Sequence, residues 1–165
     1  MAEPLREPEM RLEMRSKPRL LAAARAMVGN VAQRLGFNDV ECGQISLAVD
    51  ESLCNIINHG YDRSPDGRIW ISIFIVDQEP GGIEIVIDDL ARQVDPGTIR
   101  GRDLDDIRPG GLGVYIIREI MDKVEFACRP EGGMSLTMFK QLSSTSNTDE
   151  SSGGDTAQAE TSERR

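Results

Sequence analysis

Four strand-like segments between residues 68 and 141 come in two consecutive pairs. They are residues 68–76, 83–88, 123–128 and 133–141, and the first two are rich in β-branched residues. Short turns that contain proline and glycine join the members of each pair, at residues 79–82 and 129–132. Consecutive strands with such short connections pair antiparallel. The sequence therefore predicts one mostly antiparallel sheet.

Helical segments occupy the positions between these strands and the start of the chain. An edge strand is predicted at residues 10–14, and helices at residues 18–35, 39–59 and 113–122. Pro18 suits a first helical turn, Gly36 can end that helix as a C-cap, and Asp39 is expected to cap the second helix. Because helices form one set and consecutive strands another, the expected fold class is α+β, with the helices packed on one face of the sheet.

The chain divides into a globular part and two loose ends. Residues 10–142 are expected to form the domain, preceded by a flexible, Pro- and Glu-rich stretch at residues 1–9. Residues 143–165 form a Ser/Thr-rich acidic tail with no apolar residue larger than alanine. Such a tail has nothing to bury, so we expect it to be disordered, serving either solubility or regulation and docking.

Charge and hydropathy exclude several classes of function. The formal net charge is −9, whereas a nucleic-acid surface needs a basic excess. No apolar run approaches the roughly 20 residues of a membrane span, and the start lacks the apolar core of a signal peptide. Cys42, Cys54 and Cys128 suggest neither a disulfide framework nor a metal site. We therefore expect a cytoplasmic protein that acts on neither nucleic acid nor membrane.

One edge of the helix at residues 39–59 carries polar residues in helical spacing. Glu51, Asn55 and His59 follow one another at intervals of four, and a helical wheel places them beside the apolar stripe rather than opposite it. A carboxylate and a carboxamide at such an edge can hold a metal-bound phosphate and a nucleophile. The alternative is the polar shoulder of an ordinary amphipathic helix.

Two further places carry chemistry. Asp88 and Asp89 close the strand at residues 83–88, where a carboxylate either caps a turn or accepts a hydrogen bond from a nucleotide base. Residues 108–113 read Arg-Pro-Gly-Gly-Leu-Gly and lead directly into an apolar helix. Clustered glycines before a helix N-terminus can cradle a phosphate, although a flexible loop is the alternative. The pattern is neither a P-loop nor a dinucleotide fingerprint.

Taken in this order, the three places resemble a known family. The segment ISLAVDESLCNIINHGY looks like the N-box of the GHKL superfamily of ATPases, nearest to the anti-sigma-factor serine/threonine kinases. Residues 89–96 resemble that family's DxG box, and GGLGVYIIREIMDKVEF resembles its second glycine box. The match covers about residues 10–142 and implies a two-layer α/β sandwich of the Bergerat, histidine-kinase-like type.

The resemblance implies ATP and Mg²⁺ as cofactors and a role for each matching residue. Glu51 matches the catalytic acid, and Asn55 matches the residue that coordinates the metal. The remaining residues expected to contact the nucleotide are His59, Asp89, Ala91, Arg108, Gly110, Gly111, Leu112 and Gly113. The DxG box departs from the family, because Ala91 stands in place of its glycine and Val94 in place of a phenylalanine. This departure puts the strength of ATP binding in question.

By the same resemblance, the substrate is a STAS-fold anti-anti-sigma protein and a sigma factor is a further partner. Family members commonly form homodimers, which the sequence neither supports nor opposes. An alternative is a nucleotide-dependent binding module without kinase turnover, motivated by the altered DxG box. A detached histidine-kinase domain is disfavoured, because the single histidine, His59, lies inside the N-box. Among the arginines of the 96–110 segment, the sequence does not select the one that contacts phosphate.

Overall fold

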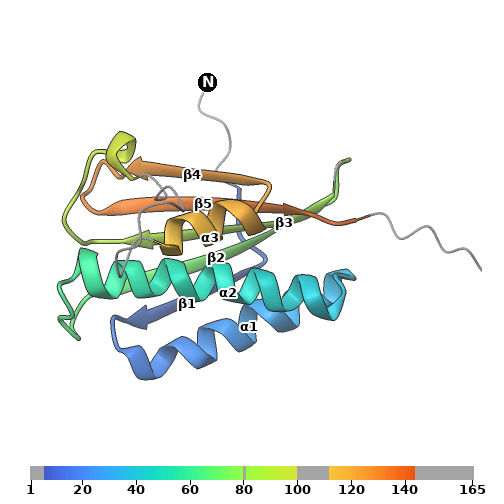
Figure 1. Cartoon of the computed structure of the whole chain (residues 1–165), viewed down its shortest axis with the longest axis horizontal. Coiled ribbons are helices and arrows are strands. Elements are labelled where there is room, and N and C mark those ends of the chain that lie inside the picture. The colour runs from blue at the N-terminus through green and yellow to red at the C-terminus, as the bar shows by residue number, and fades with distance from the viewer. Residues whose placement is uncertain (1–5, 80, 100–111, 144–165) are drawn as a thin grey trace, which may run out of the picture.

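The computed structural model describes residues 6–79, 81–99 and 112–143. Within these residues, five strands form one sheet in the order β1-β2-β3-β5-β4, and the helices cover one of its faces (Figure 1). The longer elements are β1 (Met10–Arg15), α1 (Leu21–Leu35), α2 (Asp39–Asn55), β2 (Arg68–Val76), β3 (Gly82–Asp89), α3 (Leu112–Ile120), β4 (Lys123–Cys128) and β5 (Met134–Gln141). Three short helical turns are η1 (Pro18–Leu20), η2 (Ile56–Gly60) and η3 (Pro96–Thr98).

The sheet is held together by antiparallel ladders and an isoleucine-rich inner face. Every pairing between the described strands is antiparallel. Alternate residues of the two central strands are fully buried against the helices, namely Ile69, Ile71 and Ile73 of β2 and Ile83, Ile85 and Ile87 of β3. This period of two places one side of each strand in the core. The expected α+β class, with helices on one face of an antiparallel sheet, is confirmed.

Helix α1 ends where predicted but begins later, at Leu21, because Pro18–Leu20 form the separate turn η1. It buries Ala24, Val28 and Ala32, which are spaced by four and form one face. Gly36 ends it with φ of 100°, a left-handed conformation in which glycine carries no steric cost. α1 and α2 approach closely, since a β-carbon added to Gly29 of α1 would lie 2.9 Å from Ser46 Oγ.

Helix α2 differs from its prediction in its N-cap residue and in its end. The N-cap is Asn38, not Asp39 as expected, because the Asn38 side chain accepts a hydrogen bond from the Glu41 backbone N–H while the Glu41 carboxylate accepts one from the Asn38 N–H. This reciprocal capping box leaves Asp39 as the first helical residue. At the other end, α2 gives way after Asn55 to η2, a wider π-helical turn that the sequence pattern did not predict.

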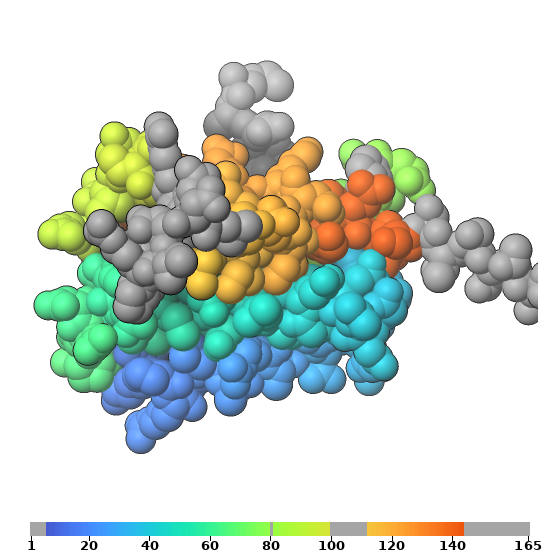
Figure 2. All heavy atoms as spheres, viewed as in Figure 1, coloured from blue at the N-terminus to red at the C-terminus, as the bar shows by residue number. Residues whose placement is uncertain are grey.

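The ends of three elements meet at one end of the molecule. The last turn of α2, the end of β3 and the start of α3 all lie at the left in Figure 1. The space-filling view shows α2 and α3 side by side on the same face (Figure 2). No helix within the described residues has the length and apolar character needed to cross a membrane.

Candidate functional site

Glu51 and Asn55 lie on a half-buried edge of α2, and the first turn of α3 packs against them. A β-carbon added to Gly113 would lie 2.7 Å from Glu51 Oε2 and 3.1 Å from Asn55 Nδ2. Gly113 itself is buried. The structure thus brings these three predicted site residues together, and a side chain at position 113 would displace the Glu51 carboxylate.

The first turn of α3 gives this place a favourable environment for an anion. The first N–H groups of an α-helix have no partner within the helix, and the helix dipole puts positive partial charge at that end. α3 starts at Leu112, a residue that is 51% exposed, and continues with the buried Gly113. Arg108, Gly110 and Gly111, which are also predicted site residues, lie outside the described residues, as do Arg100 and Arg102.

His59 follows Asn55 on the π-helical turn η2. The helical wheel assumed 100° per residue as far as residue 59, but the backbone is π-helical from Ile56 to Gly60. The Tyr61 N–H bonds the Ile56 carbonyl at 2.9 Å, five residues back, so the turn is wider than the wheel assumed. The His59 side chain is exposed. The printed contacts with the first turn of α3 come from Glu51 and Asn55, and the role of His59 stays a prediction.

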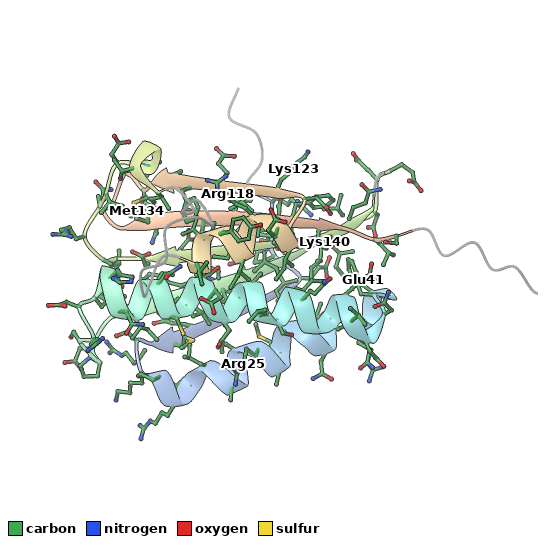
Figure 3. The ribbon with its side chains drawn as sticks, in the orientation of Figure 1. Arg25, Glu41, Arg118, Lys123, Met134 and Lys140 are labelled. Carbon is green, nitrogen blue, oxygen red and sulfur yellow. The ribbon has the colours of Figure 1, made fainter. Side chains whose placement is uncertain are left out.

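Asp89 is a buried carboxylate at the end of β3. It is 3% exposed, and its Oδ1 accepts hydrogen bonds from the Ala91 N–H at 2.8 Å and the Met134 N–H at 3.1 Å. Figure 3 shows Met134 at the same end of the molecule as the start of α3, away from Glu41. Burial raises the pKa of Asp89, while the two backbone donors oppose part of that shift. The second oxygen, Oδ2, accepts no hydrogen bond from a described residue.

Ala91 and Gly60 connect the Asp89 turn to the end of the α2 segment. Ala91 is buried, and a β-carbon added to Gly60 would lie 2.9 Å from the Ala91 β-carbon. The methyl group that departs from the family's DxG pattern therefore packs against η2. The two halves of the site are joined at this contact, because η2 directly follows Asn55.

The turn between β4 and β5 contacts Asp89 from the other side, and this contact was not predicted from the sequence. The Arg129 guanidinium donates to the Asp89 carbonyl at 2.8 Å. Gly133 has φ of 82°, and a β-carbon there would lie 2.0 Å from that same carbonyl oxygen. The hydroxyl of Tyr61, the last residue of the N-box-like segment, accepts a hydrogen bond from the N–H of Leu90, the residue after Asp89. The sequence signals were the Gly132-Gly133 pair and the position of Tyr61 at the end of the N-box-like segment.

The described residues contain no group of three or more His, Cys, Asp or Glu side chains able to hold a metal ion. The oxygen donors at the junction of α2 and α3 are the Glu51 carboxylate and the Asn55 carboxamide. Such hard oxygen donors suit Mg²⁺, which commonly keeps water and phosphate ligands instead of an all-protein cage. The donor set therefore fits a metal that arrives with a nucleotide.

Comparison with known proteins gives consistent matches. Residues 14–155 match the family model described as "Histidine kinase-like ATPase domain". The chain is 28% identical to the serine-protein kinase RsbW of Halalkalibacterium halodurans over 77% of its length and 79% of the relative's. It is 32% identical to the anti-sigma F factor of Oceanobacillus iheyensis, covering 82% of the chain and 93% of that protein. Its fold is similar to one in the SiaB–SiaC complex of Pseudomonas aeruginosa, with TM-score 0.56 and 11% identity over 82% of this chain and 91% of that one.

Proposed function

Because the chain belongs to the histidine kinase-like ATPase domain family, we propose that it is an ATP-dependent serine/threonine protein kinase that regulates by partner switching. The observation that carries the proposal is the packing of the first turn of α3 onto Glu51 and Asn55. That junction combines a candidate base, a candidate metal ligand and a helix N-terminus, which are the parts that phosphoryl transfer needs.

The base of the nucleotide is assigned to the Asp89 turn. Two backbone N–H groups fix Asp89 Oδ1, and its other oxygen is left to accept a hydrogen bond from the amino group of adenine. A buried carboxylate favours a ligand that donates a hydrogen bond to it. A ligand without a donor at this place would leave the desolvation cost of the carboxylate uncompensated. Ala91 closes the same turn and packs away toward Gly60.

The phosphates are assigned to the start of α3. The N–H groups of a first helical turn have no partner within the helix, and with the helix dipole they favour negative charge at Leu112 and Gly113. Arg108, Gly110 and Gly111 directly precede this turn in sequence, and we assign them to the same phosphates on the family resemblance. His59 is assigned to the phosphate side on that resemblance alone.

Asn55 Oδ1 is the protein oxygen that we assign to Mg²⁺. When bound, the metal supplies neutralisation of charge on the phosphate oxygens. Glu51, one turn earlier in α2, accepts or orients the proton of the incoming serine or threonine hydroxyl. The α3 N–H groups hold the phosphate that is transferred, so positioning and electrostatic stabilisation supply most of the rate enhancement.

The partners are assigned by family. We propose a STAS-fold anti-anti-sigma protein as the phosphorylated substrate and a sigma factor as the protein held in check. The names of the relatives support this, since one is a serine-protein kinase and another an anti-sigma factor. A homodimer is the assembly proposed on the same resemblance.

The test is phosphate transfer from labelled ATP with Mg²⁺ to the STAS-fold proteins encoded in the same genome. We expect wild type to label a serine or threonine of one of them, and Glu51→Gln to bind ATP but to transfer at least about a hundredfold more slowly. ATP binding without transfer to any of these proteins would support the alternative, a nucleotide-dependent binding module. Equal transfer by wild type and Glu51→Gln would remove Glu51 from the mechanism.

A further inference from the structure

The peptide unit that joins Asp89 to Leu90 is held at both ends by side chains from distant parts of the chain. Its carbonyl oxygen accepts a hydrogen bond from Arg129 Nη1 at 2.8 Å. Its N–H, contributed by Leu90, donates to the Tyr61 hydroxyl at 2.8 Å. We propose that Tyr61 and Arg129 are positioning residues that fix the orientation of the Asp89 carboxylate toward the nucleotide base. This inference rests on the proposed assignment of Asp89 to adenine.

Tyr61 acts at the point where β2 and β3 separate. The last paired residues are Ile69 and Asp89, so the same register would next place Arg68 opposite Leu90. The Tyr61 hydroxyl lies between these two residues instead. It donates to the Arg68 carbonyl at 2.6 Å and accepts from the N–H groups of Leu90 and Arg68. The hydroxyl therefore replaces the next rung of the ladder and satisfies backbone groups that would otherwise lose their partners.

The Tyr61 side chain is itself held firmly. A β-carbon added to Gly67 would lie 2.5 Å from the Tyr61 ring, so the ring lies against the backbone of residue 67. Burial raises the pKa of the Tyr61 hydroxyl, with opposing contributions from its hydrogen bonds to Leu90 and Arg68. The neutral hydroxyl is the form able both to donate and to accept.

Arg129 is fixed by several contacts besides the Asp89 carbonyl. Its guanidinium pairs with Glu131, lies 3.9 Å from Asp88 Oδ1, and sits 5.5 Å from the centre of the Trp70 ring. The side chain is 16% exposed. A guanidinium with this many partners offers a rigid donor, which a lysine at the same place would not reproduce.

The orientation of this peptide affects the orientation of the Asp89 carboxylate. The carboxylate bonds back to the Ala91 N–H, only one residue beyond the clamped peptide. A rotation of the Asp89–Leu90 peptide would therefore shift both the backbone and the Oδ1 acceptor, and with them the direction of Oδ2. A small change in the direction of Oδ2 should reduce discrimination between nucleotide bases more than it reduces the stability of the protein, because the strength of a hydrogen bond depends on its angle.

The experiment compares two nucleotides that differ only in the group Asp89 would contact. ATP carries the exocyclic amino group, and purine riboside 5′-triphosphate lacks it. In wild type we expect the dissociation constant of the second nucleotide to be on the order of tenfold higher, as for a hydrogen bond to a charged group. In Asp89→Ala the ratio should fall to about one. Both constants are measured by titration calorimetry with Mg²⁺ present.

Tyr61→Phe and Arg129→Met are the clamp variants, and Arg68→Met is the matched control. The Arg68 guanidinium also contacts the Trp70 ring, at 5.1 Å, but it donates to Glu13, whereas the Asp89–Leu90 peptide bonds Arg129 and Tyr61. We expect the clamp variants to lower the nucleotide ratio to about threefold or less, while Arg68→Met keeps the wild-type ratio. Arg129→Lys, which retains a donor, should recover part of the loss. Thermal unfolding confirms that each variant is folded.

Two results would overturn the inference, and they differ. If wild type discriminates between the nucleotides and the folded clamp variants discriminate equally well, Tyr61 and Arg129 serve only the stability of the turn. If wild type binds neither nucleotide, or binds both equally, the assignment of Asp89 to adenine fails and the positioning role falls with it.

Discussion

The methyl group of Ala91 occupies the space that a side chain at position 60 would need: a β-carbon on Gly60 would lie 2.9 Å from the Ala91 β-carbon. The DxG pattern of the resembling family has glycine where this chain has Ala91. Here the additional methyl is accommodated because η2 ends in a residue without a side chain. The contact is between a methyl and backbone-attached carbon, so neither side can rotate away.

The first prediction is that positions 60 and 91 are energetically coupled. Gly60→Ala should lower the free energy of unfolding by about 1–3 kcal/mol through overpacking. In the Ala91→Gly background the same change should cost much less, because the opposing methyl is gone. Urea unfolding of the four proteins in a double-mutant cycle measures the coupling. An equal cost of Gly60→Ala in both backgrounds would show that the contact does not exist in solution.

Ala91→Gly should also leave ATP affinity within about threefold of wild type, because the buried methyl packs on Gly60 rather than at an exposed surface. Titration with ATP and Mg²⁺ checks this. A tenfold or larger gain in affinity for the glycine variant would mean that the methyl obstructs the base after all.

A second prediction concerns Gly113, where the added atom meets the end of a flexible side chain. A β-carbon there would lie 2.7 Å from Glu51 Oε2, so the carboxylate must move while the backbone need not. Gly113→Ala should therefore keep its melting temperature and lose at least about tenfold in phosphate transfer. Gly43→Ala is the matched control in α2, since no atom lies within 4 Å of its added β-carbon. If Gly113→Ala transfers phosphate at the wild-type rate, the position of the Glu51 carboxylate does not affect the reaction.

A third prediction follows from the buried charge of Asp89. Burial raises its pKa above the ordinary value of 3.8, so folding favours the protonated form. The stability contributed by this preference is full below the unfolded-state pKa and is lost as pH rises through the folded-state pKa. Asp89→Asn retains an acceptor for the two backbone N–H groups and carries no charge.

The free energy of unfolding of Asp89→Asn relative to wild type should therefore increase with pH across that window and level off above it. Urea unfolding at a series of pH values measures the difference, with exposed Asp77→Asn as the control for general charge effects. A difference that decreases with rising pH would contradict the stated sign. The same variant should bind ATP weakly, because its amide NH₂ would face the amino group of the base.

A fourth prediction distinguishes the observed cap of α2 from the one expected from sequence. Asn38→Ala removes the side-chain acceptor of the capping box and should lower the free energy of unfolding by about 1 kcal/mol. Asp39→Ala should cost less, because Asp39 contributes only its charge near the helix N-terminus. Chemical unfolding of both variants decides between them. A larger loss of stability for Asp39→Ala than for Asn38→Ala would indicate that Asp39 is the N-cap.

Most of the fold could be predicted because its signals are local. The isoleucines of β2 and β3 alternate with a period of two, and Gly36 ends α1 as expected. The errors arose where neighbouring residues offer the same chemistry or where the helix geometry changes. Asn38 and Asp39 are both good caps, and nothing in the spacing of residues 56–60 signals a π-helical turn.

The site could be predicted only in part. Glu51, Asn55 and Gly113, which lie together in the structure, could be predicted. Their signals are the helical spacing of the first two and a glycine at the start of an apolar helix. Tyr61, Arg129 and Gly133 were missed, since their partners are backbone groups about 30–45 residues away and such contacts depend on tertiary register. Arg108, Gly110 and Gly111 remain predictions outside the described residues.

The most direct test of the central claim is titration calorimetry of ATP with and without Mg²⁺, for wild type beside Asn55→Ala and Asp89→Ala. We predict that wild type binds ATP more tightly with Mg²⁺, that Asn55→Ala loses the metal dependence, and that Asp89→Ala loses most of the affinity. If wild type binds no ATP at concentrations up to about 1 mM, which corresponds to a binding free energy of roughly 4 kcal/mol, the assignment of an ATP site is wrong.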